Sequence, residues 1–279
     1  MPFDTLTLVG VGLVGGSVGL AARRRGVVRH VVGTDHNLDN LSRASASGIL
    51  DRAAPDLADA VTGADLVVFC TPVDRIAEHV LAAAPHCRAG ALLTDVGSTK
   101  AAIVRALDGR LPEGLAFVGG HPLAGSEKHG PDHADADLFE GRLVVLTPCG
   151  SGAGMDQAAD FWNALGARVR VMEADDHDRA LALTSHLPHL AASALAGTVP
   201  LELLDLTATG FGDATRLAAG CPDVWTAIFH ANRDALRAAL DSYQDRLDLF
   251  RRALETGDRA VIEQLLVEGK RQRDALRKE

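Results

Sequence analysis

Aromatic residues are scarce in this chain of 279 residues, since Phe, Tyr and Trp together make up only 4% of it. Basic residues are also in the minority, and the formal net charge is −9. Proteins that bind nucleic acids need basic patches and stacking rings, and this chain is poor in both. The composition therefore argues against a nucleic-acid partner.

Cysteine is rare as well. The four cysteines stand apart from one another without a C-x-x-C pair, which favours free thiols over disulfides or a zinc site. The amino terminus has no basic segment leading into an apolar run, and no apolar run approaches the length of a membrane span. We expect a globular, cytoplasmic protein with no membrane partner. Its length and its hydrophobic content of 47% predict two domains.

The first 35 residues contain a glycine motif in the context of a strand followed by a helix. An apolar strand at 6–9 runs into the pattern G-x-G-x-x-G, whose glycines allow a tight turn, close approach of a pyrophosphate and packing of the helix on the strand. The motif predicts a dinucleotide site with the phosphates at the helix N-terminus. The residues expected to contact the cofactor here are Gly10, Gly12, Leu13, Val14 and Gly15.

A second apolar strand at 27–34 ends in Asp35, about 20 residues past the last glycine of the motif, where a ribose-binding acid is expected. A carboxylate accepts hydrogen bonds from ribose hydroxyls and repels a 2′-phosphate. Asp35 therefore predicts NAD rather than NADP as the cofactor.

Strand and helix patterns continue to alternate as far as Met172, which predicts a mainly parallel sheet. Expected strands lie at 65–70, 91–95, 115–118, 143–146 and 168–171, and expected helices at 38–47, 73–84, 97–107 and 155–165. Thr71 and Pro72 follow the strand at 65–70, at the sheet edge where ligands bind, and are further candidates for cofactor contact. We assign 1–172 to a Rossmann-like α/β dinucleotide-binding domain.

From Glu173 onward only helical patterns occur, so 173–279 is predicted to be an all-α domain. One apolar stripe alternates spacings of four and three residues and is expected to form a buried helical core; it comprises Leu236, Leu240, Tyr243, Leu247, Phe250 and Leu254. A helical half of this size has much apolar surface to cover. We therefore expect it to pair with a second copy of the chain.

Two polar residues at strand ends are candidates for the chemistry. Ser98 and His121 follow successive strands, so they are expected to converge beside the nicotinamide. Oxidation of an alcohol needs a base for the hydroxyl proton, and an imidazole that titrates near neutrality suits that task. The alternative is a histidine that only anchors its loop. Ser126 and Glu127 follow in the same segment, where Glu127 either orients a ligand hydroxyl or caps the next turn.

Three further features leave alternatives open. The polar segment 129–139 is either a mobile lid or a solvated linker. Pro188, within the run Ser185–His189, is expected to bend its helix and expose side chains to a cleft; nearby histidines and acids form no complete metal-ligand set, so no metal is predicted. Arg216 either grips a substrate carboxylate or forms a surface ion pair, and Trp225 lies close to it in the sequence.

Together these segments resemble the prephenate and arogenate dehydrogenase family of tyrosine biosynthesis. The resemblance rests on the glycine motif with Asp35 and on several spaced segments, namely Cys70–Val73, Asp95–Lys100, Gly119–Glu127, Ser185–His189, Phe211–Ala218 and Trp225. It implies that His121 accepts the ring hydroxyl proton with help from Ser98, and that Arg216 binds a substrate carboxylate. It also implies a homodimer joined through the helical domains. The remaining residues implied to line the substrate pocket are Ser126, Glu127, Ser185, His189 and Trp225.

The reaction implied by the resemblance is NAD-dependent oxidative decarboxylation of prephenate to 4-hydroxyphenylpyruvate. Arogenate and 4-amino-4-deoxyprephenate are the alternative substrates. One departure bears on the choice, because several relatives carry a basic residue where this chain has Gly212, and a less cationic pocket favours or tolerates arogenate. A rival from another class is a non-catalytic NAD sensor. A 3-hydroxyacid dehydrogenase needs a catalytic lysine on its helical domain, and no lysine occurs between Glu173 and Val199.

Overall fold

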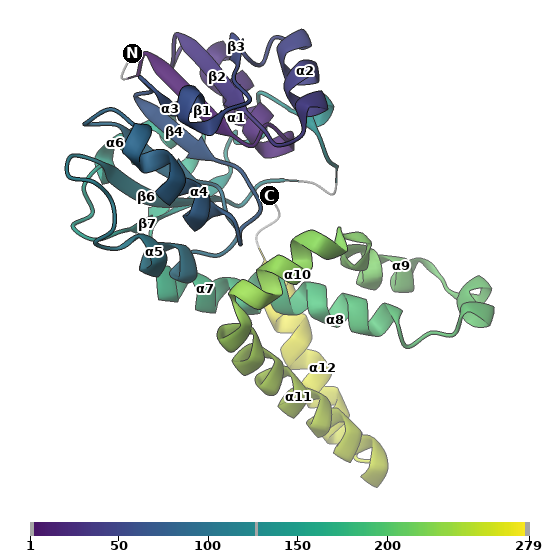
Figure 1. Cartoon of the computed structure of the whole chain (residues 1–279). Coiled ribbons are helices and arrows are strands. Elements are labelled where there is room, and N and C mark those ends of the chain that lie inside the picture. The colour runs from purple at the N-terminus through teal and green to yellow at the C-terminus, as the bar shows by residue number, and fades with distance from the viewer. Residues whose placement is uncertain (1–2, 126–127, 277–279) are drawn as a thin grey trace. The chain divides into compact units, whose positions relative to one another are not determined.

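An eight-stranded sheet dominates the first part of the chain in this computed structural model, which describes residues 3–125 and 128–276 (Figure 1). The strands are β1 (Thr5–Val9), β2 (His30–Thr34), β3 (Arg52–Ala53), β4 (Leu66–Phe69), β5 (Leu92–Asp95), β6 (Ala116–Pro122), β7 (Leu143–Pro148) and β8 (Arg168–Val171). Their order is β3-β2-β1-β4-β5-β6-β7-β8, and all neighbours are parallel except β6 and β7. The predicted Rossmann-like, mainly parallel sheet is confirmed.

Helices cover both faces of this sheet. They are α1 (Leu13–Arg24), α2 (Leu38–Ala46), α3 (Leu57–Val61), α4 (Ile76–Ala83), α5 (Ala101–Leu107) and α6 (Met155–Ala164), with short 3₁₀ turns η1 (Ala84–His86) and η2 (Pro131–His133). The side chains of successive residues of β4 point to opposite faces of the sheet. Val68 packs in a core with residues of α1 and α6, whereas Val67 and Phe69 pack with residues of α4 and α5. All three are fully buried, which explains why this strand is continuously apolar.

The strand β6 is longer than the sequence predicts. We expected it to end at Val118 and to leave His121 in a loop, but the strand continues to Pro122 because β7 pairs with it antiparallel, with His121 opposite Val145. The partner strand lies more than 20 residues further along the chain, so a local pattern does not reveal it. His121 is consequently held on a paired strand rather than on a loop.

The polar segment 129–139 is tied to the first two helices. The backbone N–H of Asp135 donates to Ser17 Oγ of α1 at 2.9 Å, and Arg43 of α2 forms an ion pair with Asp132. Ala134 lies so close to α1 that a Cβ on Gly16 would come within 2.9 Å of its side chain. The segment is thus anchored beside the glycine motif.

After β8 the chain is helical throughout its described part, as expected from the sequence. The elements are α7 (Ala174–Leu181), the π-helical turn η3 (Ala182–His186), α8 (Leu187–Ala196), η4 (Leu201–Leu206), α9 (Thr209–Thr215), η5 (Arg216–Ala219), α10 (Pro222–Ala231), α11 (Arg233–Thr256) and α12 (Arg259–Asp274). The expected distortion near Pro188 is the π-helical turn, after which α8 begins with this proline in its first turn.

The chain separates into two compact units, Met1–Asn232 and Arg233–Glu279. The first contains the sheet together with α7 to α10, and the second contains α11 and α12. The domain limits 1–172 and 173–279 therefore stay a prediction. No helix within 3–125 and 128–276 has the length and apolar character needed to cross a membrane.

In the second unit α11 and α12 pack together and are linked by an ion pair of 2.7 Å between Arg246 and Glu268. The apolar stripe of α11 is only partly covered. Leu236 is buried, but Tyr243, Leu247 and Leu254 are exposed by 36%, 47% and 69%. The expectation of a buried core along the whole stripe is wrong for the single chain, because α12 covers just part of the face.

Candidate active site

The glycine motif forms a turn with space for a pyrophosphate. Gly10 has a φ of +96°, and a Cβ there would lie 2.8 Å from the carbonyl oxygen of Cys70. A Cβ on Gly15 would lie 2.1 Å from Gly10 O, so only glycine lets α1 pack this closely on the turn. Around Gly12, in contrast, nothing lies within 4 Å of the Cβ position, so a ligand can approach the backbone there. Leu13 and Val14 begin the helix.

Asp35 lies next to this turn at the end of β2. Its carboxylate accepts hydrogen bonds from the backbone N–H of Val11 and of Asn37, both at 2.8 Å, and its side chain is 5% exposed. Each oxygen keeps lone pairs for a further donor such as a ribose hydroxyl. Thr71, beyond β4, exchanges a hydrogen bond of 3.0 Å with His79 Nδ1, and Pro72 is exposed next to it. These residues fit the adenosine and pyrophosphate parts of a dinucleotide.

A buried ion pair ties the turn that carries Ser98 to the strand that carries His121. Asp95, at the end of β5, accepts from Gly97 N at 2.8 Å and from Gly120 N at 2.9 Å, and it pairs with Lys100 Nζ. Both side chains of the pair are completely buried. Burial lowers the pKa of Lys100 more than the neighbouring Asp95 raises it. Ser98 itself is half-buried in the turn before α5.

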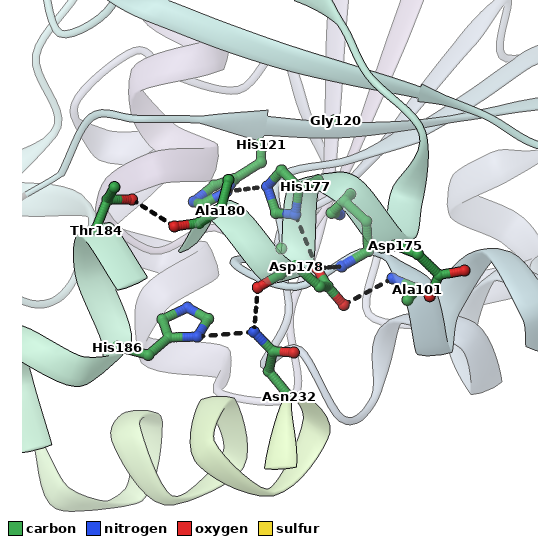
Figure 2. A network of polar contacts seen from close by, with 12 residues as sticks. Ala101, Gly120, His121, Asp175, His177, Asp178, Ala180, Thr184, His186 and Asn232 are labelled. Atoms are coloured by element: carbon green, nitrogen blue, oxygen red, sulfur yellow. Dashed lines mark hydrogen bonds and ion pairs between the residues drawn. The ribbon is translucent and has the colours of Figure 1, made fainter. Parts of the chain in front are cut away.

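His121 is connected to a second histidine and a carboxylate (Figure 2). Its Nδ1 lies 2.8 Å from Nε2 of His177, and His177 Nδ1 lies 2.8 Å from Asp178 Oδ1. Asp178 also accepts from the backbone N–H groups of Lys100 and Ala101 at 2.8 and 3.0 Å. Nε2 of His121 has no hydrogen bond to any residue that the structure describes. Within the described part of the chain, one nitrogen of the imidazole is thus anchored and the other has no partner.

The surroundings keep His121 neutral and Asp178 ionised. Burial, followed by the neighbouring His177, Lys100 and His186, holds the pKa of His121 well below the usual value of 6.5. Burial alone would raise the pKa of Asp178, but hydrogen bonds from His177 and the α5 backbone outweigh it and lower the pKa below its usual range. An unprotonated imidazole of this kind is suited to accept a proton at neutral pH.

A third histidine, His186, lies on the π-helical turn and is linked to the same network by Asn232. The Asn232 amide donates to Asp178 O at 2.7 Å and to His186 Nδ1 at 3.0 Å, as Figure 2 shows. Since His186 Nδ1 accepts, its proton lies on Nε2, which is buried without a hydrogen-bond partner among the described residues. Burial lowers the pKa of His186 to about 4, so the ring is neutral.

Aromatic rings gather on α8 and α10. His189 stacks on Trp225 with ring centroids 3.3 Å apart, and burial followed by the charge of Arg216 lowers the pKa of His189. Arg216, at the start of η5, is exposed and forms no ion pair with a described carboxylate. An unpaired guanidinium beside stacked rings is suited to bind a carboxylate on a cyclic ligand.

All the predicted site residues that the structure describes belong to the first unit. His121 and the Ser98 turn lie at the carboxyl ends of adjacent strands, and Ser185 is half-buried on the π-helical turn. Ser126 and Glu127 lie outside the described residues. Among the residues described, no group of three or more His, Cys, Asp or Glu side chains is arranged to hold a metal ion.

Sequence reasoning missed the supporting residues of the site, namely Asp95, Lys100, His177, Asp178, His186 and Asn232. A signal was present for the residues on α7 and η3. His177, Asp178, Leu181, Ala182 and His186 form one buried helical face. Three polar residues on an otherwise apolar face are costly unless they are hydrogen-bonded, so their position indicates a network.

Comparison with known proteins agrees with this architecture. Residues 18–171 match the family model described as the prephenate dehydrogenase nucleotide-binding domain, and residues 173–268 match the prephenate dehydrogenase dimerization domain. Cyclohexadienyl dehydrogenase of Zymomonas mobilis is 34% identical over 99% of this chain and 97% of its own length. Prephenate dehydrogenase of Bacillus subtilis is 31% identical over 98% of this chain and 76% of its own length.

Among solved structures, prephenate dehydrogenase from A. aeolicus in complex with hydroxyphenyl propionate and NAD+ superposes with a TM-score of 0.88. It is 30% identical, and the match covers 98% of this chain and 99% of that one. The matches extend over both the sheet and the helical part that carry the site. The chain belongs to the prephenate dehydrogenase family.

Proposed function

We propose that this chain catalyses the NAD-dependent oxidative decarboxylation of prephenate to 4-hydroxyphenylpyruvate, with His121 as the catalytic base. The observation that carries the assignment of the base is the hydrogen bond that anchors His121 through Nδ1, which leaves Nε2 without a partner among the described residues, while burial holds the pKa of the ring well below its usual value. His121 takes the proton of the ring hydroxyl while the ring carboxylate leaves as CO₂. Bound NAD supplies the hydride acceptor at this edge.

The cofactor is held by the glycine turn and its neighbours. The open space at Gly12 and the α1 N-terminus suit the pyrophosphate, and the lone pairs of Asp35 suit the ribose hydroxyls. The expected contacts are Gly10, Gly12, Leu13, Val14, Gly15, Asp35, Thr71 and Pro72. A 2′-phosphate would meet the Asp35 carboxylate, which favours NAD over NADP.

The substrate is held between the base and the helical region. Ser98 assists the proton transfer from the turn before α5, Arg216 binds a carboxylate, and the His189–Trp225 stack borders the ring. Ser126, Glu127 and Ser185 complete the proposed pocket. Arg216 forms no ion pair with the carboxylates that the structure describes, which supports this assignment over a surface ion pair.

Arogenate is the second candidate substrate. Gly212, in α9, supplies no cation where several relatives have one, and prephenate differs from arogenate in carrying a keto-acid instead of an amino-acid side chain. Comparison of kcat/KM for the two substrates decides between them, and a large preference for prephenate excludes the arogenate assignment.

The activity is tested by following the absorbance of reduced nicotinamide. Purified chain is mixed with NAD and, in turn, prephenate, arogenate and 4-amino-4-deoxyprephenate. Turnover of prephenate with release of CO₂ supports the proposal. Binding of NAD without turnover of any of the three would indicate the non-catalytic sensor instead.

Gly220 provides a test of the ring stack. A Cβ at this position would lie 2.6 Å from Trp225 Nε1 and 2.9 Å from His189 Cε1, so Gly220→Ala must displace the stack. Because small displacements of positioning groups are costly, we expect KM for the substrate to rise about tenfold. Gly197→Ala, at the end of α8, is the matched control, since its Cβ position has only ordinary contacts at 3.5 and 3.6 Å. Equal KM values for the two variants would show that the His189–Trp225 stack is not part of the substrate pocket.

We further propose that two copies of the chain associate through their carboxyl-terminal helices. The support is the incompletely covered stripe of α11, together with Leu266 and Val267 on α12, which are exposed by 59% and 58%. Light scattering at micromolar concentration is expected to give twice the mass of one chain, and Leu254→Asp to lower it toward the single mass. A monomeric wild type would contradict the proposal.

A further inference from the structure

The hydrogen bonds behind His121 determine which of its nitrogens carries the proton. Two imidazoles that share one hydrogen bond need a single N–H between them, and the distance of 2.8 Å between His121 Nδ1 and His177 Nε2 indicates such a bond. Which ring donates depends on the partner at the far side of His177. That partner is Asp178.

Asp178 is placed to accept hydrogen bonds. Its two oxygens receive the backbone N–H groups of Lys100 and Ala101, which can only donate. These contacts hold the group as a carboxylate, so the hydrogen between Asp178 Oδ1 and His177 Nδ1 belongs to the imidazole. The two backbone donors also stabilise the negative charge without an imidazolium. A neutral His177 then has an unprotonated Nε2.

We propose that His177 and Asp178 are positioning residues that hold His121 with its proton on Nδ1 and its lone pair on Nε2. In this arrangement Asp178 accepts from His177, His177 accepts from His121, and His121 presents Nε2 as the base. The inference rests on the proposed function, because it defines how the base is prepared for the substrate hydroxyl. Neither positioning residue needs to touch the substrate.

The proton balance during turnover is simple. The O–H bond of the substrate breaks and an N–H bond forms at His121 Nε2, which leaves a positive charge on that ring. The Nδ1–H donates to His177, whose own N–H points to the Asp178 carboxylate, so the new cation is stabilised through two hydrogen bonds.

The other charged and titratable groups around His121 make this stabilisation necessary. Lys100 lies nearby as a buried cation, although Asp95 pairs with it, and His186 approaches from the π-helical turn. Lys100 and His186 both oppose a charge on His121, and His177 does the same whenever it is itself protonated. The Asp178 carboxylate is connected to His121 through the ring of His177. Its negative charge therefore offsets the repulsion that a positive charge on His121 would meet.

The proton position can be measured without an assay. In protein labelled with ¹⁵N-histidine, ring nitrogen shifts distinguish a protonated Nδ1 from a protonated Nε2, and comparison with His121→Asn identifies the His121 signals among the 11 histidines. We expect Nδ1 to carry the proton at neutral pH in the free enzyme. A proton on Nε2 of His121 would overturn the proposal.

Two amide variants separate the two links of His177. In His177→Gln the side-chain oxygen can take the place of Nε2 and still accept from His121. In His177→Asn the shorter amide can take the place of Nδ1 and reach only Asp178. We expect the Gln variant to keep kcat within about tenfold of wild type and the Asn variant to lose about 10²-fold, with little change in NAD affinity.

The split between kcat and KM distinguishes positioning from a general loss of structure. Without the acceptor at His177 the ring of His121 is no longer held in one orientation and tautomer, so in His177→Asn kcat is expected to fall while KM for the substrate and Tm stay near the wild-type values. An Asn variant with a kcat within threefold of wild type would overturn the proposal. A wild type that turns over none of the substrates would refute the proposed function instead, whereas the NMR measurement would still test the position of the proton.

Discussion

Replacement of His121 by Asn is expected to lower kcat by about 10²-fold or more. Asn keeps a polar side chain on β6 but has no basic nitrogen at the position of Nε2. The hydroxyl proton would then leave without an acceptor as hydride transfer proceeds. NAD affinity, measured by calorimetry, should stay nearly unchanged because the glycine turn and Asp35 lie at β1 and β2, on other strands of the sheet.

Two comparisons make this result specific. His30→Asn removes an exposed imidazole at the start of β2 and should leave kcat at the wild-type value. Because burial lowers the pKa of His121 well below 6.5, the wild-type base is unprotonated at neutral pH, and kcat/KM should fall only as the pH drops below that lowered pKa. Near-normal turnover by His121→Asn would exclude this residue as the base.

The second large effect is expected from Lys100→Met. Met is similar in length but carries no charge, so the variant leaves the Asp95 carboxylate buried without its counter-ion. Breaking a buried pair in this way costs about 3–5 kcal/mol of unfolding free energy. For a unit of this size that loss lowers Tm by about 10 °C. Asp95 also accepts hydrogen bonds from the backbone N–H groups of Gly97 and Gly120, which lie next to Ser98 and His121. We therefore expect kcat to fall as well.

Lys270→Met is the matched control for stability. Lys270 pairs with Asp274 on α12, but the two side chains are 74% and 60% exposed, so its loss should change the unfolding free energy by no more than about 0.5 kcal/mol. Adding Asp95→Asn to Lys100→Met should recover part of the lost stability, because the unpaired charge is then removed. Equal Tm values for Lys100→Met and Lys270→Met would show that the Asp95–Lys100 ion pair does not stabilise the fold.

The glycine turn and the strand-end residues were predictable because their signals are local. The spacing of Gly10, Gly12 and Gly15 directly after an apolar strand permits few structures other than a dinucleotide turn. The strand β4 was recognisable from continuous apolar character, which follows from burial on both faces. The family resemblance was confirmed for the same reason, since its motifs are short segments at strand and helix ends.

The groups that support His121 were not predictable in this way. The carboxylate of Asp178 accepts from the backbone N–H of Ala101 at the start of α5, 77 residues earlier in the chain. That contact depends on how α7 packs against α5 and β7. The antiparallel partner of β6 also depends on an element distant in the sequence, since β6 ends at Pro122 and β7 begins at Leu143.

The amino-acid sequence by itself therefore determined the alternation of strands and helices and the glycine turn followed by Asp35, and it was enough to propose His121 as the base. These follow from backbone freedom at glycine, the periodicity of apolar residues and the chemistry of single side chains. Only the tertiary structure decided the environment of His121: burial lowers its pKa, and His177 with Asp178 lies behind its Nδ1. Such properties arise from contacts between elements far apart in the chain, so no local pattern encodes them.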